Sequence, residues 1–187
     1  HGLAAGLTIL PVTDTFYSMT SRGADLTELV IELNNKLRRV LPEGRFVAAI
    51  VVRIDLKSGE LQLWNGGNPP ALCINKAGSI VKEFPPTNLA LGILSPEEFV
   101  PKISAFQCNL AEEPRLYLYS DGVYEAESKE ENEPFGMARL KACLSEVASK
   151  PTAETRTEAL FEQIKTFASG QESADDMTLL ELLCGDH

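Results

Sequence analysis

The order of the expected elements predicts an α+β fold, a layered sandwich. Helical segments open the chain, a long series of strands with short turns follows, and two helices and a final strand close it. Strands joined by short turns favour mostly antiparallel sheets, and helices segregated from strands are typical of the α+β class. With 187 residues, 44% of them hydrophobic, the chain is long enough for one domain with a substantial core.

Two helical segments are expected first. Residues 3–20 are rich in Ala and Leu, and Pro11 predicts a kink or a break there. In residues 24–41 apolar side chains recur at helical spacing on one face: Leu26, Val30, Leu33, Leu37 and Leu41. A single apolar stripe opposite charged residues predicts a helix that packs on a sheet.

The middle of the chain is predicted to form strands. Residues 45–55 are nearly all apolar and β-branched, which predicts a central strand buried on both faces. Further strands are expected at 61–65, 71–75, 80–84, 100–110, 115–120 and 175–183. Two helices are expected at 137–148 and 152–168, and Thr152 followed by Glu154 is a capping signal for the second helix.

Composition excludes several classes of function. A formal charge of −10 argues against a nucleic-acid partner, since phosphate binding requires surplus Lys and Arg. No apolar run approaches the roughly 18–20 residues needed to cross a bilayer, so no membrane association is expected. The four cysteines are far apart in sequence, which favours buried free thiols in a reducing compartment over a disulfide or a thiolate metal site.

Histidine occurs only at His1 and His187. A Ser-His-Asp triad, a Cys-His pair or a His-rich zinc site is therefore not expected. Any chemistry must depend on carboxylates and other oxygen ligands, which favour hard cations such as Mg²⁺ or Mn²⁺.

Two acidic motifs lie at strand ends. Asp121 and Gly122 follow the strand of 115–120, and Asp175 and Asp176 open the last strand. If these strands are antiparallel neighbours, the carboxylates converge, and their repulsion is relieved by a shared cation. The alternative is structural: Asp-Gly is a common turn pair, and Asp175 then only caps a loop. Both motifs in a chain without internal histidine favour the metal site.

The stretch "NGGNPP" at 65–70 has two interpretations. Its glycines and prolines could shape a substrate-facing loop on which Asn68 presents an amide. A rigid connection after a strand is the simpler interpretation, and spacing alone favours it.

Five stretches together resemble the metal-dependent serine/threonine phosphatases of the protein phosphatase 2C type, in the bacterial SpoIIE and RsbU branch. They are "HGLAAGL" at 1–7, "NGGNPP" at 65–70, "LALGI" at 89–93, "LYSDGVYEA" at 118–126 and "DDMTLL" at 175–180. The resemblance implies a four-layer αββα sandwich of two mostly antiparallel sheets flanked by helices. It also implies two Mn²⁺ or Mg²⁺ ions and hydrolysis of phosphoserine or phosphothreonine by a metal-activated water.

Residue by residue, the resemblance implies that Asp121 and Asp175 are metal ligands and the catalytic carboxylates. It implies that Gly122 and Asp176 support that corner from behind the ligands. Two departures stand out. The family's first metal-binding Asp would lie upstream of His1, outside this sequence, and Asn68 occupies a position where relatives usually have His.

The resemblance further implies a single phosphatase domain over 1–187, the C-terminal output domain of a longer cytoplasmic bacterial regulator, lacking its N-terminal strand or strands. A sensor or receiver domain would precede it in the same chain. The implied substrate is a small phosphoprotein of the anti-anti-sigma, STAS type, within stress or sigma-factor signalling. Two alternatives remain open: a non-catalytic adaptor with a phosphatase fold, and a structural α+β domain whose acidic corners bind Ca²⁺.

Overall fold

The computed structural model describes residues 3–128, 133–168 and 176–185. The chain forms two compact units, which we describe one at a time. The first unit comprises His1–Ile54, Leu61–Asn68 and Pro86–Phe106. The second unit comprises Asp55–Glu60, Pro69–Pro85 and Gln107–His187.

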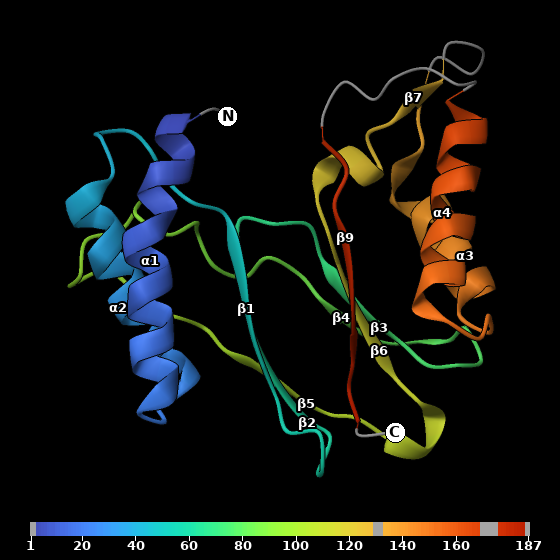
Figure 1. Ribbon diagram of the computed structural model, residues 1–187, viewed down its shortest axis with the longest axis horizontal. Helices are drawn as coiled ribbons and strands as arrows, with labels where there is room; N and C mark the ends of the chain where they lie inside the picture. The colour runs from blue at the N-terminus through green and yellow to red at the C-terminus, as the bar shows by residue number, and fades with distance from the viewer. Residues whose placement is uncertain (1–2, 129–132, 169–175, 186–187) are drawn as a thin grey trace. The chain divides into compact units, whose positions relative to one another are not determined.

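The first unit contains two helices and three strands (Figure 1). They are α1 (Leu3–Ser21), α2 (Leu26–Val40), β1 (Ala49–Ile54), β2 (Glu60–Gly66) and β5 (Ser104–Gln107). The backbone stays helical through Pro11, so the expected break there is wrong. Helix α2 begins at a capping box, in which the Asp25 side chain accepts from the Glu28 N–H at 2.8 Å and Glu28 reaches back to the Asp25 N–H.

The stripe predicted on α2 is confirmed as its buried face. Leu26, Val30, Leu33 and Leu37 are buried, and Leu41 lies at the C-cap, half-buried. These side chains share one hydrophobic cluster with Val51 of β1 and Trp64 of β2, so α2 packs on the sheet as expected.

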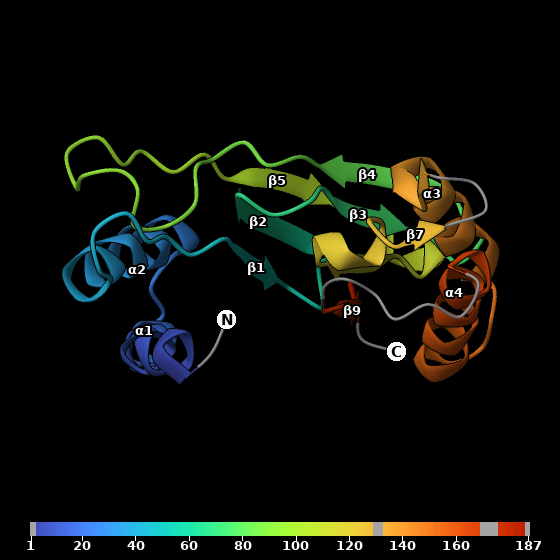
Figure 2. The same cartoon turned by 90° about the horizontal axis from the view of Figure 1, so that it is seen from above.

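The three strands of this unit form a sheet in the order β1-β2-β5 (Figure 2). Strand β1 pairs antiparallel with β2, from Ala49 opposite Gly66 to Ile54 opposite Leu61. The prediction of a central strand buried on both faces at 45–55 is therefore wrong. Strand β1 lies at the sheet edge, where only Val51 is buried and Arg53 is exposed, and β2 takes the central place.

The second unit contains the other elements. They are β3 (Ala71–Ile74), β4 (Ile80–Phe84), the 3₁₀ turn η1 (Leu110–Glu112), β6 (Arg115–Tyr119), the 3₁₀ turn η2 (Asp121–Val123), β7 (Glu127–Ser128), β8 (Glu133–Pro134), α3 (Gly136–Val147), α4 (Ala153–Phe167) and β9 (Leu179–Leu183). Helices α3 and α4 match the predicted ranges to within one residue, whereas the last strand begins at Leu179, later than the predicted start at Asp175. Thr152 caps α4 as expected, but its partner is Thr155 rather than Glu154.

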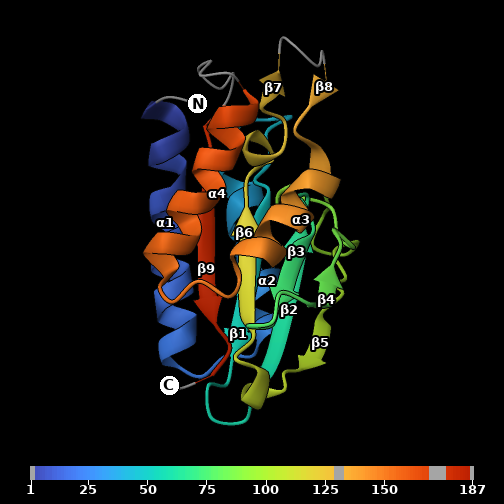
Figure 3. The same ribbon diagram turned by 90° about the vertical axis from the view of Figure 1, so that its right-hand side faces the viewer.

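Four of these strands form a sheet in the order β4-β3-β6-β9. All three of its strand pairs are antiparallel, as predicted. Helices α3 and α4 lie across one face of this sheet (Figure 3). The core between them includes Leu72, Ile74 and Tyr117 from the strands and Leu140 and Leu160 from the helices.

Helices and antiparallel sheets together confirm the α+β class. In the described part of the chain, no helix is both long and apolar enough to cross a membrane.

Candidate active site

The pairing of β6 with β9 brings the two acidic motifs to one edge of the sheet. The register runs from Arg115 opposite Leu183 to Tyr119 opposite Leu179. One residue further on, the Ser120 N–H donates to the Thr178 carbonyl at 3.0 Å. Asp121 therefore follows the end of β6 beside the segment 176–178 that leads into β9, which confirms the antiparallel neighbours that the sequence predicted.

Ser120 ties this corner together through its side chain. Its hydroxyl accepts from the Thr178 N–H at 2.9 Å and donates to the Asp176 carbonyl at 3.0 Å. The segment that carries the second acidic motif is thus bonded to the residue next to Asp121. The sequence did not lead us to predict a role for Ser120, although this residue directly precedes the Asp-Gly pair.

Asp121 opens the turn η2 and is exposed. Its Oδ1 accepts from the Gly122 N–H at 3.1 Å, and its carbonyl accepts from the N–H groups of Tyr124 and Glu125, both at 3.0 Å. These bonds fix the backbone of the turn, while the carboxylate remains accessible to a ligand. Gly122 itself is buried beneath the turn.

The corner is negatively charged, and this charge shifts the pKa of the neighbouring Tyr124. Burial raises the pKa of the Tyr124 hydroxyl, and the negative charges of Glu125 and Asp121 raise it further. A field that disfavours a phenolate favours a cation at the same place.

Of the two acidic residues in the second motif, the structure describes only Asp176. Asp176 is described, exposed, and held through its carbonyl by Ser120. Asp175 lies outside the described residues. Within the described part of the chain, no group of three carboxylates converges at this corner, and the only cluster of three residues suited to a metal consists of cysteines.

Asn68 lies in the first unit, after β2. Its N–H donates to Oδ1 of the buried Asn65 at 3.2 Å, and Gly67 between them has a φ of +83° that favours glycine. This is the rigid connection that the sequence favoured. The Asn68 side-chain nitrogen is nevertheless buried without a hydrogen-bond partner among the described residues, so its amide still has a donor to offer.

The donors at the β6–β9 corner suit a hard divalent cation. Mg²⁺ and Mn²⁺ bind to proteins through exposed carboxylates, and water molecules complete the coordination shell. Asp121 supplies such an oxygen from an exposed carboxylate, and its negative charge contributes to the raised pKa of the Tyr124 hydroxyl. The residues present therefore fit the metal.

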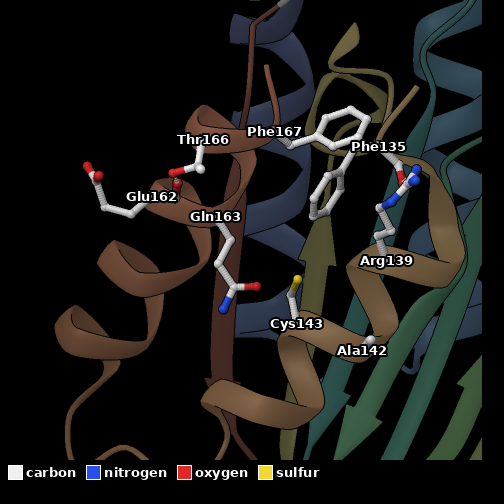
Figure 4. A pocket seen from close by; sticks show the side chains of 8 residues that line it. All are labelled: Phe135, Arg139, Ala142, Cys143, Glu162, Gln163, Thr166 and Phe167. Atoms are coloured by element: carbon white, nitrogen blue, oxygen red, sulfur yellow. Dashed lines mark hydrogen bonds between the residues drawn. The ribbon is translucent and has the colours of Figure 1, made fainter. Parts of the chain in front are cut away.

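A groove of about 520 Å³ lies elsewhere in the second unit, between α3 and α4 (Figure 4). Its lining is mostly apolar, with Phe135 and Phe167 in edge-to-face contact at 5.3 Å and Arg139 over the Phe167 ring. It contains none of the predicted ligands, so we do not assign the hydrolytic chemistry to it.

The chain matches a known protein family over almost its whole length. Residues 1–183 match the family model described as Stage II sporulation protein E (SpoIIE). The chain belongs to the SpoIIE family. A search of the curated proteins found no match.

Solved structures share the fold of this SpoIIE chain. The SiaA-PP2C domain of Pseudomonas aeruginosa has a TM-score of 0.79 at 19% identity, over 98% of this chain and 71% of that one. The RsbU and RsbW domains of a Mycobacterium tuberculosis protein have a TM-score of 0.71 at 19% identity, over 97% of this chain and 48% of that one. The PP2C phosphatase domain of Bacillus subtilis SpoIIE was solved with a fragment of its regulatory domain. It has a TM-score of 0.62 at 18% identity, over 90% of this chain and 47% of that one.

The chain thus spans about half the length of two of these neighbours. Two other structures of this fold involve divalent metals by their descriptions: RsbX in complex with magnesium, and a B. subtilis SpoIIE phosphatase domain presoaked with Mn. The SpoIIE chain therefore has the fold of PP2C-type phosphatase domains.

Proposed function

We propose that this domain removes phosphate from a serine or threonine of a small signalling phosphoprotein, with Mn²⁺ or Mg²⁺ held at the β6–β9 corner. The observation that carries the proposal is the hydrogen-bonded junction of Ser120 with Asp176 and Thr178, which joins the two acidic motifs. In this proposal Asp121 and Asp175 are the metal ligands contributed by this chain.

Each residue of the corner has a separate part in the proposal. Asp121 presents an exposed carboxylate from a turn whose backbone is fixed by three hydrogen bonds. Asp176 and Gly122 hold the two acidic segments from behind. When bound, two divalent ions would neutralise phosphate charge and lower the pKa of the attacking water.

The substrate and the setting belong to the same proposal. We infer a substrate of the anti-anti-sigma, STAS type, because the fold is similar to that of an RsbU domain and of the phosphatase domain of the cell fate determinant SpoIIE. The domain would act in the cytoplasm as the output of a longer regulator, with a sensor or receiver domain ahead of it in the chain.

The test is hydrolysis of p-nitrophenyl phosphate by the protein, expressed with any residues that its gene encodes before His1, with and without Mn²⁺. We expect turnover that depends on Mn²⁺. Asp121→Asn removes one charged ligand, and we expect the rate to fall at least about 100-fold, more than the 10- to 100-fold typical of losing a residue behind a ligand.

Glu158→Gln is the matched control, because it removes one carboxylate charge from an exposed position of α4. We expect it to leave the rate and the Mn²⁺ dependence unchanged. Equal rates for Asp121→Asn and the wild type at saturating Mn²⁺ would refute the proposed site. A folded protein that neither hydrolyses the substrate nor binds Mn²⁺ would instead establish the non-catalytic adaptor.

A further inference from the structure

Three of the four cysteines meet inside the second unit. The sulfur atoms of Cys73, Cys108 and Cys184 all lie within 4.8 Å of one another. Their exposed fractions are 0%, 4% and 0%. All three are free thiols, although they come from three distant parts of the sequence.

The fold holds each of these cysteines through its backbone. Cys73 lies in β3, between Lys82 of β4 and Leu116 of β6. The Cys184 N–H donates to the Pro114 carbonyl at 3.1 Å, and the Cys108 N–H donates to the Gly59 carbonyl at 3.0 Å. The donor set is therefore positioned before any ligand arrives, which reduces the entropy lost on binding.

Gly59 is what allows the Cys108 segment to lie so close. Its φ is +75°, and a Cβ atom there would lie 2.8 Å from a methyl carbon of Leu110 and 3.0 Å from the Cys108 carbonyl. A side chain at this position would therefore strain the backbone and crowd the Cys108 segment.

The cluster lies on the face of the sheet opposite the helices. Cys73 is opposite Leu116, and Leu116 is opposite Leu182, so these three share one face, and Cys184 follows Leu182 by two residues. The alternate residues Leu72, Ile74 and Tyr117 pack toward α3 and α4. The fourth cysteine, Cys143, is on α3 and lines the groove between the two helices (Figure 4), so it is a natural internal control.

The spacing of the sulfurs suits a metal better than a disulfide. With metal–sulfur bonds of about 2.3 Å, three sulfurs around one ion would be about 4.0 Å apart, within an ångström of the observed limit. A disulfide requires the sulfurs to approach to about 2.05 Å and leaves the third thiol unused.

The donor set also selects among metals. Soft thiolates favour Cu⁺ and Zn²⁺ over the hard cations of the acidic corner. Structural Zn²⁺ takes four ligands, and among the described residues no carboxylate or imidazole joins the three sulfurs. Three buried sulfurs without a fourth donor match a three-coordinate ion.

From this geometry we infer a second metal site, in which Cys73, Cys108 and Cys184 bind one Cu⁺ ion through three sulfur atoms. Binding breaks the S–H bonds, releases the protons to buffer and forms Cu–S bonds, and copper stays Cu⁺ throughout.

The test is anaerobic competition for Cu⁺ against the chromophoric chelator bathocuproine disulfonate, with the reduced protein. Because the thiols are buried, Cu⁺ is supplied both to the native protein and during refolding from urea. We expect one Cu⁺ per chain. Cys73→Ser, Cys108→Ser and Cys184→Ser should each weaken binding at least about 100-fold, whereas Cys143→Ser should bind like the wild type.

X-ray absorption of the wild-type protein with one equivalent of Cu⁺ needs no variant to fold, and we expect a single shell of three sulfurs. A shell of two sulfurs, or equal loss of affinity in Cys143→Ser, would overturn the site. Preference for Zn²⁺ over Cu⁺ in the same competition would overturn the three-coordinate assignment. Failure of phosphatase activity has no bearing on these readouts, since the ligands of the two sites are different residues.

Discussion

Ser120 shows how a single hydroxyl can position a site made from two distant segments. Its oxygen takes part in two hydrogen bonds, one from Thr178 and one to Asp176, and its own N–H extends the β6–β9 ladder by one residue. Because Asp121 is the next residue, a shift of Ser120 changes the distance between the two acidic motifs. Ser120 is thus a positioning residue in the proposed site.

Removing the Ser120 hydroxyl tests that role. We expect Ser120→Ala to lower the free energy of unfolding by about 1–2 kcal/mol, because two hydrogen bonds of modest net value are lost. We also expect the Mn²⁺ affinity to fall about 10- to 100-fold, as for a residue that orients a metal ligand. Urea unfolding and Mn²⁺ titration measure the two effects.

The conservative variant separates positioning from folding. Ser120→Thr keeps the hydroxyl, and the extended backbone at Ser120, with φ of −80° and ψ of 163°, accepts a β-branched side chain. We expect it to restore most of the Mn²⁺ affinity. Loss of the same affinity in both variants would show that the hydroxyl does not position the ligands.

At the scale of elements, a buried ion pair joins α4 to the edge strand β9. Arg156 donates from Nε to Glu181 at 2.8 Å, makes a second bond to the other Glu181 oxygen, and donates to the Lys150 carbonyl at 2.6 Å. The Arg115 guanidinium lies 3.7 Å from Glu181 as well. One buried carboxylate therefore balances two buried guanidinium groups.

Neutralising that carboxylate should be costly. Glu181→Gln leaves Arg156 and Arg115 without their shared anion, and we expect a loss of about 3–5 kcal/mol in the free energy of unfolding. Glu113→Gln makes the same isosteric change at a half-exposed carboxylate 3.8 Å from Arg115, and we expect a loss of at most about 1 kcal/mol. Urea denaturation measures the free energy of unfolding of both variants. Equal losses in Glu181→Gln and Glu113→Gln would contradict the role given to the buried ion pair.

At the scale of the whole molecule, the stability of the second unit depends on buried hydroxyl groups that face its helices. Burial raises the pKa of Tyr117, and the charge of Glu181 raises it further. Burial likewise raises the pKa of Tyr119, with smaller contributions from Glu83 and Tyr124. Unfolding exposes both phenols, which then ionise near their ordinary pKa of about 10.

The sign of the resulting pH dependence follows from these raised values. The stabilisation is fully present below about pH 10 and declines above it, by about 1.4 kcal/mol per pH unit for each tyrosine. We expect the urea midpoint to fall between pH 10 and pH 11. Tyr119→Phe should make that fall shallower, whereas Tyr17→Phe, at a side chain that is 67% exposed, should not. Equal slopes for the two variants would refute the assignment.

Local patterns in the sequence were sufficient for much of the fold. The sequence correctly predicted the stripe on α2, the ranges of α3 and α4 to within one residue, and the existence of the last strand. These features follow from the periodic pattern of apolar residues within a short stretch of sequence. The approach of the Asp121 motif to the final strand was also predicted, since both acidic motifs lie at strand ends. Strand 45–55 was misjudged, because an apolar run does not say whether a strand lies at the centre or the edge.

By itself, then, the sequence determined most of the helices and strands, and which carboxylates stand near their ends. Only the tertiary structure decided that Ser120 bonds across to Asp176, that Arg156 and Arg115 share Glu181, and that three distant cysteines meet. The physical reason is that such contacts depend on strand order and register, which are set by hydrogen bonds and packing between segments far apart in the chain.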